Sequence, residues 1–244
     1  MTGPGAAAWT PYCGAAPLPG DWLGRWNLDP LVLAGLALLL IAVRRAERPA
    51  LGMAATALLL LLFVTPFCAL TSALFSARVT HHVLLTAAVA PLLVLAMARA
   101  RTHWPGSIAL WTGVQAITFW LWHEPGLYAR ALSSDAVYWA MQASLLGTAT
   151  VFWAALRRSS QPAAIAALLA TTVQMGLLGA LITFAGTPVY PPHLLTTQAW
   201  GLGALEDQQL AGLIMWAPSA GLYLAAALVL AQRWLAREER GLAS

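Results

Sequence analysis

Long hydrophobic stretches make up most of this 244-residue chain, and short segments that carry arginine, proline or glycine separate them. Apolar stretches of this kind are typical of transmembrane helices, since about 20 residues cross one bilayer. The pattern predicts seven, at Leu28–Val43, Leu51–Leu70, Val79–Met97, Ile108–Trp122, Ala136–Leu156, Ala163–Ala185 and Gln209–Leu235. We therefore expect an all-α fold, an integral membrane bundle of seven transmembrane helices at 28–235, between tails at 1–27 and 236–244.

Composition excludes an ordinary soluble domain. Hydrophobic residues make up 60% of the chain and charged residues 9%, and the mean hydropathy is +0.71. A soluble domain carries about 25% charged residues. The first 21 residues lack a basic stretch followed by an apolar one, so we do not expect a cleavable signal peptide there. The net charge of +4 comes without a basic run, which argues against a nucleic-acid partner.

Arginine placement predicts the orientation of the bundle. The odd-numbered loops and the C-terminal tail hold Arg44, Arg45, Arg48, Arg99, Arg101, Arg157, Arg158, Arg233, Arg237 and Arg240. The opposite side holds Arg25, Arg78 and Arg130. Cytoplasmic loops are enriched in arginine and lysine, so the N-terminus is expected outside and the C-terminus inside. The two cysteines, Cys13 and Cys68, are too few for a disulfide framework, but a single bridge between them remains open.

Most polar residues with reactive side chains fall at the predicted outer side. They are His81, His82, His123, Tyr128, His193, Glu206, Asp207 and Gln208. Ionisable groups near hydrocarbon are costly and often mark a functional site. Helix capping and hydrogen bonding at helix ends are the alternative explanation. Imidazole is a common ligand for copper, zinc and iron, so a metal site is the leading functional hypothesis.

Three of these segments contribute candidate ligands. Adjacent helical residues point about 100° apart, so His81 and His82 are not expected to bind one ion by themselves. His123 ends the fourth segment among tryptophans, where an interfacial anchoring role is the alternative. In the seventh segment Asp207 is a candidate N-cap, and Met215 is a soft thioether that suits Cu(I) or simply fills the core.

Glycine also shapes the seventh segment, because Gly212 would allow a neighbouring helix to approach closely.

The chain contains no zinc-protease, nucleophile-elbow or phosphate-loop motif, so an enzyme is not expected.

Several motifs, in order along the chain, resemble the polytopic CtaG family of cytochrome c oxidase assembly factors. They are Trp26–Pro30, Leu74–His82, Trp122–Pro125 with Leu127 and Tyr128, Gly179–Ala185 with Pro188 and Tyr190, and Asp207–Trp216. The resemblance implies a multi-pass protein of the bacterial inner (cytoplasmic) membrane that helps to mature a haem–copper oxidase, around copper insertion at the CuB centre. His82, His123, Asp207 and Met215 match the family's motifs.

The chain departs from the family pattern at three places. Many members carry histidine where Arg78 stands and glutamine where His81 stands. Many also have a Glu-His pair near Met141 and Gln142. A fixed set of histidines is therefore not the common feature of the site.

Our leading hypothesis is a non-enzymatic metallochaperone that holds Cu(I) transiently through His82, His123 and Met215, with His81 as a further ligand. Asp207 would orient a histidine. Arg78 would pair with either Asp207 or Glu206. Expected partners are the catalytic subunit of the oxidase, membrane lipid and a periplasmic copper donor. The alternatives are a metal-free scaffold that binds the oxidase subunit, and a copper transporter.

Overall fold

The computed structural model describes residues 11–97 and 105–242, and in these ranges every regular element is helical. The α-helices are α1 (Pro30–Arg44), α2 (Pro49–Phe63), α3 (Pro66–Ala73), α4 (Phe75–Leu84), α5 (Ala90–Ala96), α6 (Ile108–Trp122), α7 (Pro125–Ala131), α8 (Asp135–Leu156), α9 (Gln161–Thr183), α10 (Ala204–Ile214) and α11 (Ala220–Leu242). Short π segments join α4 to α5 (Leu85–Val89) and α10 to α11 (Met215–Ser219). The all-α prediction is confirmed for the described residues.

Each predicted segment corresponds to one helix or to a run of helices, but the number of membrane spans is smaller by length and composition. Within the described residues, three helical runs are long and apolar enough to cross a bilayer: Phe75–Ala96, Gln161–Thr183 and Ala204–Arg240. The bent pair α2–α3 would make a fourth. α1 and α6 are apolar but shorter. The count of seven spans and the orientation of the termini remain predictions, and Arg99 and Arg101 lie outside the described residues.

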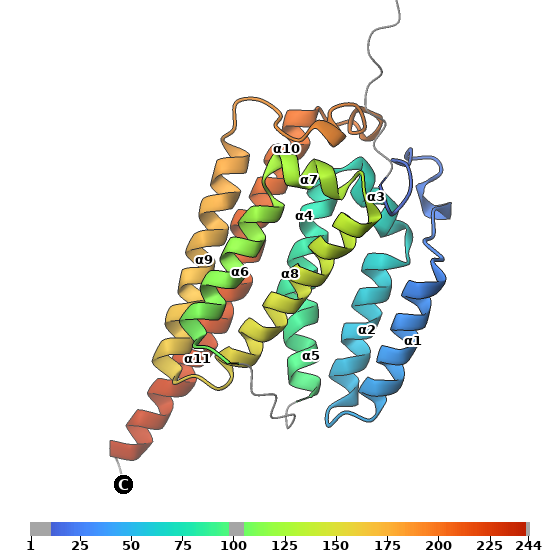
Figure 1. The fold of residues 1–244 in the computed structure, drawn as a ribbon. Coiled ribbons are helices and arrows are strands. Elements are labelled where there is room, and N and C mark those ends of the chain that lie inside the picture. Colours follow the sequence, from blue (N-terminus) through green and yellow to red (C-terminus); the bar gives the residue numbers. More distant parts are fainter. Residues whose placement is uncertain (1–10, 98–104, 243–244) are drawn as a thin grey trace, which may run out of the picture.

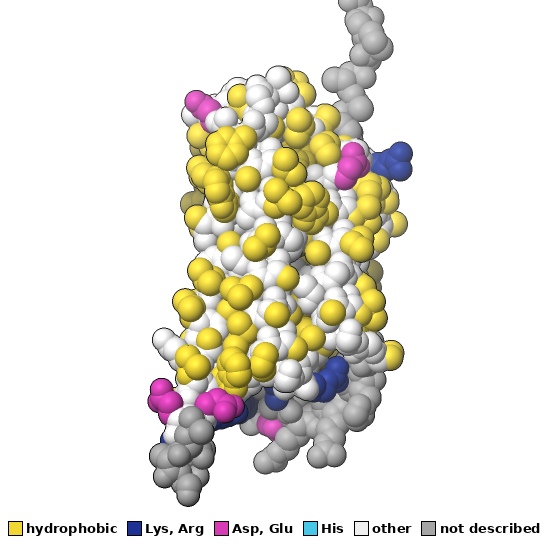
Figure 2. Space-filling model, turned by 90° about the vertical axis from the view of Figure 1, so that its left-hand side faces the viewer, with side chains coloured by type: hydrophobic (Ala, Val, Ile, Leu, Met, Phe, Trp, Pro, Cys, Tyr) yellow, Lys and Arg dark blue, Asp and Glu magenta, His cyan; other side chains and the backbone are white. Residues whose placement is uncertain are grey.

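The long helices run side by side, with α1 and α2 at one edge and α9 and α11 at the other (Figure 1). The side of the molecule in Figure 2 is covered mainly by hydrophobic side chains, and the charged side chains visible there lie near its two ends. This distribution is typical of a helical bundle in a membrane. One end carries α3, α7 and the segment 184–203, which folds over the helices (Figure 1). We call it the capped end.

The sequence motif around Asn27 starts the first helix and supports the second. Asp29 is the N-cap of α1, accepting the N–H of Leu31 at 2.7 Å, and Pro30 occupies the first turn, where its missing N–H costs nothing. The Asn27 amide donates to the carbonyl of Phe63 at 2.9 Å, at the end of α2. The motif therefore joins the beginning of one helix to the end of the next.

The predicted segment Leu51–Leu70 is divided into two helices. α2 ends at Phe63, and α3 begins at Pro66 after a bend of 49°. Proline has no N–H to continue the α2 hydrogen-bond ladder, and Thr65 caps the new helix through the N–H of Phe67. The continuous hydrophobic pattern concealed this break.

The π segment at Leu85–Val89 has a local cause. The N–H of Ala90 bonds to the carbonyl of Leu85, and the following residue, Pro91, has no N–H to offer to the carbonyl of Thr86. The indole N–H of Trp153, on α8, donates to the carbonyl of Thr86 instead, at 3.0 Å. The neighbouring helix thus supplies the hydrogen bond that Pro91 cannot donate.

Glycines set the closest helix crossing. A Cβ built at Gly212 would lie 2.3 Å from the Thr183 hydroxyl oxygen, and one at Gly179 would lie 2.8 Å from the Gly212 carbonyl oxygen. The backbones of α9 and α10 can meet here only without side chains. The expectation that Gly212 permits close approach is confirmed.

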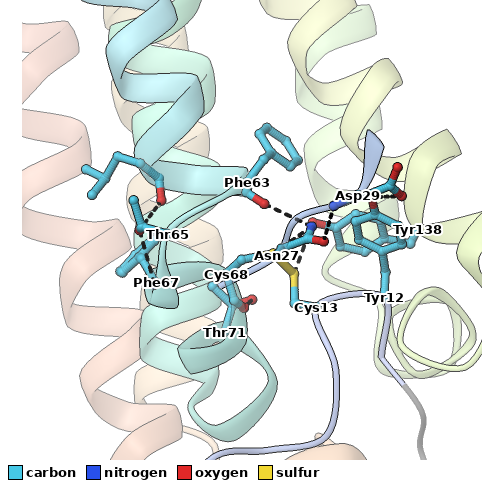
Figure 3. The surroundings of a disulfide bond; sticks show 11 residues. Tyr12, Cys13, Asn27, Asp29, Phe63, Thr65, Phe67, Cys68, Thr71 and Tyr138 are labelled. Atoms are coloured by element: carbon cyan, nitrogen blue, oxygen red, sulfur yellow. Dashed lines mark hydrogen bonds between the residues drawn. A yellow bond between two sulfur atoms is a disulfide. The ribbon is translucent and has the colours of Figure 1, made fainter. Parts of the chain in front are cut away.

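The N-terminal tail is packed onto the capped end from residue 11 onward. Cys13 and Cys68 form a disulfide, with their Cα atoms 5.4 Å apart, so the bridge left open by the sequence is present (Figure 3). The Tyr12 hydroxyl donates to Asp29 at 2.5 Å, and the Trp200 indole donates to the carbonyl of Pro17 at 3.1 Å. The segment 11–27 is therefore part of the folded bundle.

Candidate metal-binding site

Asp207 holds the beginning of α4. Its carboxylate accepts the N–H of Phe75 at 2.6 Å and the N–H of Ser76 at 3.3 Å, and it also accepts the hydroxyl of Ser76. These are N–H groups of the first turn, which have no partner within their own helix. A buried carboxylate from another helix satisfies them and suits the positive end of the helix dipole.

This arrangement corrects the prediction that Asp207 caps its own helix. The N-cap of α10 is Gly203, and Glu206 accepts the Gly203 N–H at 2.7 Å. Asp207 lies one position further on and points to α4 instead. It is a positioning group for the helix that carries the two adjacent histidines.

His82 and His123 are neighbours in the interior. Their ring centroids lie 5.4 Å apart, with the rings nearly perpendicular, and both side chains are buried. His82 lies on α4, and His123 ends α6, so the two imidazoles come from helices about 40 residues apart in sequence. The structure brings together this part of the predicted ligand set.

The free nitrogens of the two rings are suited to a ligand. The Nδ1 of His123 lies 2.7 Å from the carbonyl oxygen of Phe119 and must donate to it, which leaves Nε2 as the nitrogen with a lone pair. Among the residues that the structure describes, that Nε2 has no hydrogen-bond partner, and neither nitrogen of His82 has one. Buried polar atoms without partners are costly and need an explanation.

His81 lies beside His82 but is packed against two other aromatic rings. Its ring centroid lies 5.9 Å from that of His82 and 4.9 Å from that of Phe63, and its ring is parallel to the ring of Phe67. Among residues 11–97 and 105–242, no group of three or more His, Cys, Asp or Glu side chains is placed to hold one metal ion. His81 and Asp207 therefore do not join His82 and His123 in a single cluster of that kind.

Met215 is fully buried and begins the π segment that leads into α11. This segment packs against α4, the helix of His82. Pro218 lies inside it and cannot donate to the helical ladder, so the helix widens at this point. Local irregularities of this type often occur at functional sites.

Arg78 does not form the predicted ion pair. In the part of the chain that the structure describes, its guanidinium makes no salt bridge with Asp207 or Glu206, and its three nitrogens have no hydrogen-bond partner. The carboxylates are already occupied, by the start of α4 and by the Gly203 N–H. The Arg78 guanidinium instead lies 5.3 Å from the ring centroid of Tyr138.

His193 was left unassigned by the sequence, and the structure gives it a clear position. It is buried in the covering segment 184–203, where its Nε2 lies 2.6 Å from the Tyr128 hydroxyl and its Nδ1 lies 3.3 Å from the carbonyl of Ala73. Burial, with the Arg78 charge as a second cause, lowers the pKa of His193 to about 3. His193 is thus a neutral hydrogen-bonding group, and its proline-rich sequence gave no sign of these partners.

Tyr190 ties the covering segment to the histidine pair. Its hydroxyl donates to the carbonyl of His123 at 2.8 Å, and its ring stacks on Phe75 with centroids 3.8 Å apart. The segment therefore contacts α4 and the end of α6 together. Among the family motifs, the one ending at Tyr190 was the only sequence signal for this role.

Directly after His123 lies a short helix that the sequence did not predict. α7 begins at Pro125, between two of the predicted transmembrane segments, and Glu124 is its N-cap. The Glu124 carboxylate accepts the N–H groups of Gly126 and Leu127, and these bonds lower its pKa. α7 brings Tyr128 over the interior of the bundle.

The fold and the site define a class: a helical membrane bundle with a buried histidine pair beneath a covering segment. The chain belongs to the cytochrome c oxidase caa3 assembly factor family (Caa3_CtaG), whose model matches residues 33–237. The family assignment suggested by the sequence motifs is confirmed, and with it the general role in oxidase assembly. No curated protein and no solved structure matches the chain.

Proposed function

We propose that this protein assists cytochrome c oxidase assembly by holding Cu(I) transiently between His82 and His123, before copper reaches the CuB centre. The observation that carries the proposal is the pair itself: two buried imidazoles with centroids 5.4 Å apart, three of whose four nitrogens have no hydrogen-bond partner among the described residues. Neutral imidazole is a metal ligand, and the Phe119 carbonyl holds His123 in the tautomer that leaves Nε2 available.

Met215 is the proposed third ligand. A thioether is a soft donor that favours Cu(I), and the segment that begins with Met215 packs against the helix of His82. A site with two imidazoles and one thioether lacks a fourth protein ligand. Such a site suits a protein that must release its metal to a partner.

The oxidase subunit is the partner that the family role implies. Copper would pass to its catalytic subunit, and a periplasmic donor would supply it. Membrane lipid would surround the hydrophobic sides of the bundle. A metal-free scaffold would use the same histidines as a hydrogen-bond network, and the unpartnered nitrogens argue against that alternative.

The test measures copper per chain after purification in detergent with excess Cu(I) and a competing chelator. Wild type is expected to bind about one copper. His82→Ala and His123→Ala should each lose it, and Met215→Leu should bind more weakly. His81→Gln is the matched control and should keep its copper, since the His81 ring lies against Phe63 and Phe67.

Two results would contradict the proposal. Wild type with no more copper than the double variant His82→Ala/His123→Ala would favour the scaffold. Loss of copper in His81→Gln alone would place the metal elsewhere. All variants are compared only after their size-exclusion profiles show folded, monodisperse protein.

A further inference from the structure

Arg78 is a buried cation without a counter-charge. The side chain lies on α4, one helical turn from His82, and has no exposed surface. None of its three nitrogens has a hydrogen-bond partner, and in the described ranges 11–97 and 105–242 no carboxylate forms a salt bridge with it. A guanidinium has five N–H donors, so the neighbouring Tyr128 and Tyr138 hydroxyls can satisfy only some of them, and its charge is unbalanced.

The ring of Tyr138 compensates only part of this cost. A cation over an aromatic ring is weakly stabilised, and Arg78 lies 5.3 Å from the centroid. The free energy that burial of an unpaired ion costs is much larger than this gain, even after the protein relaxes. The ring therefore leaves most of the cost unmet. Asp207 lies on a neighbouring helix, but its oxygens bond to Phe75 and Ser76.

The groups that interact with Arg78 carry no negative charge. Its positive charge acts on the Tyr128 and Tyr138 hydroxyls and on His193. A neutral hydroxyl can accept a hydrogen bond from the guanidinium but does not balance its charge. Both nitrogens of His81 and both polar atoms of the Gln142 amide are buried without partners as well. Water could satisfy the hydrogen bonds of such a group, but only an anion would balance the charge.

We propose that Arg78 binds one small monovalent anion, of halide or formate size, within the capped end of the bundle. The size and charge follow from the complete burial of the guanidinium, because a large anion would not fit beside it and a multivalent anion would bring more charge into the interior than one guanidinium balances. The anion would accept hydrogen bonds from the guanidinium and remove the unpaired charge. It would also lie beside His82, which shares a helix face with Arg78.

This placement has a consequence for copper, which rests on the proposed function. A Cu(I) ion at His82 would be repelled by the nearby guanidinium. An anion held by Arg78 would cancel that repulsion, so the affinity for Cu(I) should increase with the anion concentration. The anion site itself needs no copper, and it can be tested in the metal-free protein.

The experiment measures the melting temperature of the metal-free full-length protein in detergent at constant ionic strength. Sodium gluconate, whose anion is large, is replaced stepwise by bromide in one series and by formate in another. Wild type is expected to gain at least about 2–4 °C in one or both series, as a ligand that binds only the folded state would produce. Bromide alone or formate alone would identify the kind of anion.

Variants decide whether Arg78 is responsible. Arg78→Gln should lose the shift, and Arg78→Lys, which keeps the charge, should retain part of it. Arg130→Gln removes an exposed arginine and should behave like wild type. If Arg78→Gln does not fold, crystals of wild type soaked in bromide should give an anomalous peak at Arg78.

The proposal fails if wild type responds to neither anion, if Arg78→Gln keeps the full response, or if the bromide peak lies away from Arg78. The thermal series contains no metal, so its result does not depend on whether the histidine pair binds copper. Failure of the anion site and failure of the copper site are therefore separate results.

Discussion

The carboxylate of Asp207 lies 2.6 Å from the backbone nitrogen of Phe75, and this hydrogen bond joins two residues 132 positions apart in the sequence. It fixes the start of α4 against α10. Because His82 lies two turns further along α4, the position of the candidate metal site depends on a residue that does not itself belong to the histidine pair.

Asp207→Ala should destabilise the protein, because the N–H groups of Phe75 and Ser76 would be buried without an acceptor. The expected loss is about 1–3 kcal/mol in the free energy of unfolding. Urea or thermal unfolding in detergent would measure it. Glu206→Gln, one residue away and exposed, is the control and should change stability little, because the amide oxygen can still accept the Gly203 N–H. Equal losses in both variants would contradict the assigned role.

Gly212→Ala should also destabilise the bundle. The new Cβ would meet the Thr183 hydroxyl oxygen at 2.3 Å and the Thr183 backbone nitrogen at 2.7 Å, so α9 and α10 would have to separate. Forced repacking of this kind costs about 1–3 kcal/mol. Gly113→Ala is the matched control on α6, where a Cβ meets nothing within 4 Å. It should be neutral or stabilising, by up to about 1 kcal/mol. A stable Gly212→Ala variant would refute the close crossing.

Reduction of the Cys13–Cys68 bridge should release the N-terminal segment and lower stability. The bridge closes a loop with a sequence separation of 55 residues, and loss of such a disulfide costs about 2–4 kcal/mol. The melting temperature in detergent, with and without dithiothreitol, measures the effect. The double variant Cys13→Ser/Cys68→Ser should be as unstable as the reduced protein and should not respond to the reductant. A wild-type protein insensitive to complete reduction would contradict the expectation.

Stability should fall with decreasing pH partly because of His193. Burial lowers its folded-state pKa to about 3, whereas the unfolded chain takes up the proton near pH 6.5. Between these values the unfolded state binds more protons, so the neutral histidine's contribution is full above about pH 6.5 and is lost as pH falls toward 3. The slope from one such group is at most about 1.4 kcal/mol per pH unit.

The pH dependence can be assigned by substitution. His193→Gln cannot titrate, so its stability should fall less steeply than that of wild type between pH 6.5 and pH 4. The difference between the two slopes, measured by unfolding in detergent at several pH values, isolates His193 from the other buried histidines. Parallel curves for the two proteins would show that His193 does not titrate as its burial requires.

The glycine at position 212 illustrates what could be anticipated from residues alone. A glycine in a hydrophobic helix allows a close crossing, because the effect acts on the residue's own backbone. The role of Asp29 and Pro30 at the start of α1 was not anticipated, since the sequence suggested only that Trp26–Pro30 resembles a family motif. The break at Pro66 and the helix at Pro125 were missed. In a uniformly apolar sequence, the pattern of hydrophobic residues is the same on both sides of a bend. That pattern therefore does not reveal where a helix bends or where a new helix begins.

The candidate site was predictable only in part. Family motifs pointed to His82 and His123, but which of two adjacent histidines faces the other helix depends on how α4 is rotated. That rotation is set by Asp207 and by the segment containing Tyr190, which are far away in the sequence. The surroundings of His193 and of the unpaired Arg78 likewise depended on how α4 packs against the segment 184–203 and the other helices.

By itself, the sequence determined a helical membrane protein of the oxidase assembly family, because hydropathy and local motifs act along the chain. The tertiary structure decided the Cys13–Cys68 bridge, the meeting of His82 with His123, the packing of His81 against Phe63, and the isolation of Arg78 from both carboxylates. Each of these relationships joins side chains through the rotation and contact of different helices. Hydrophobic faces specify that helices pack together, but they do not fix which polar groups meet.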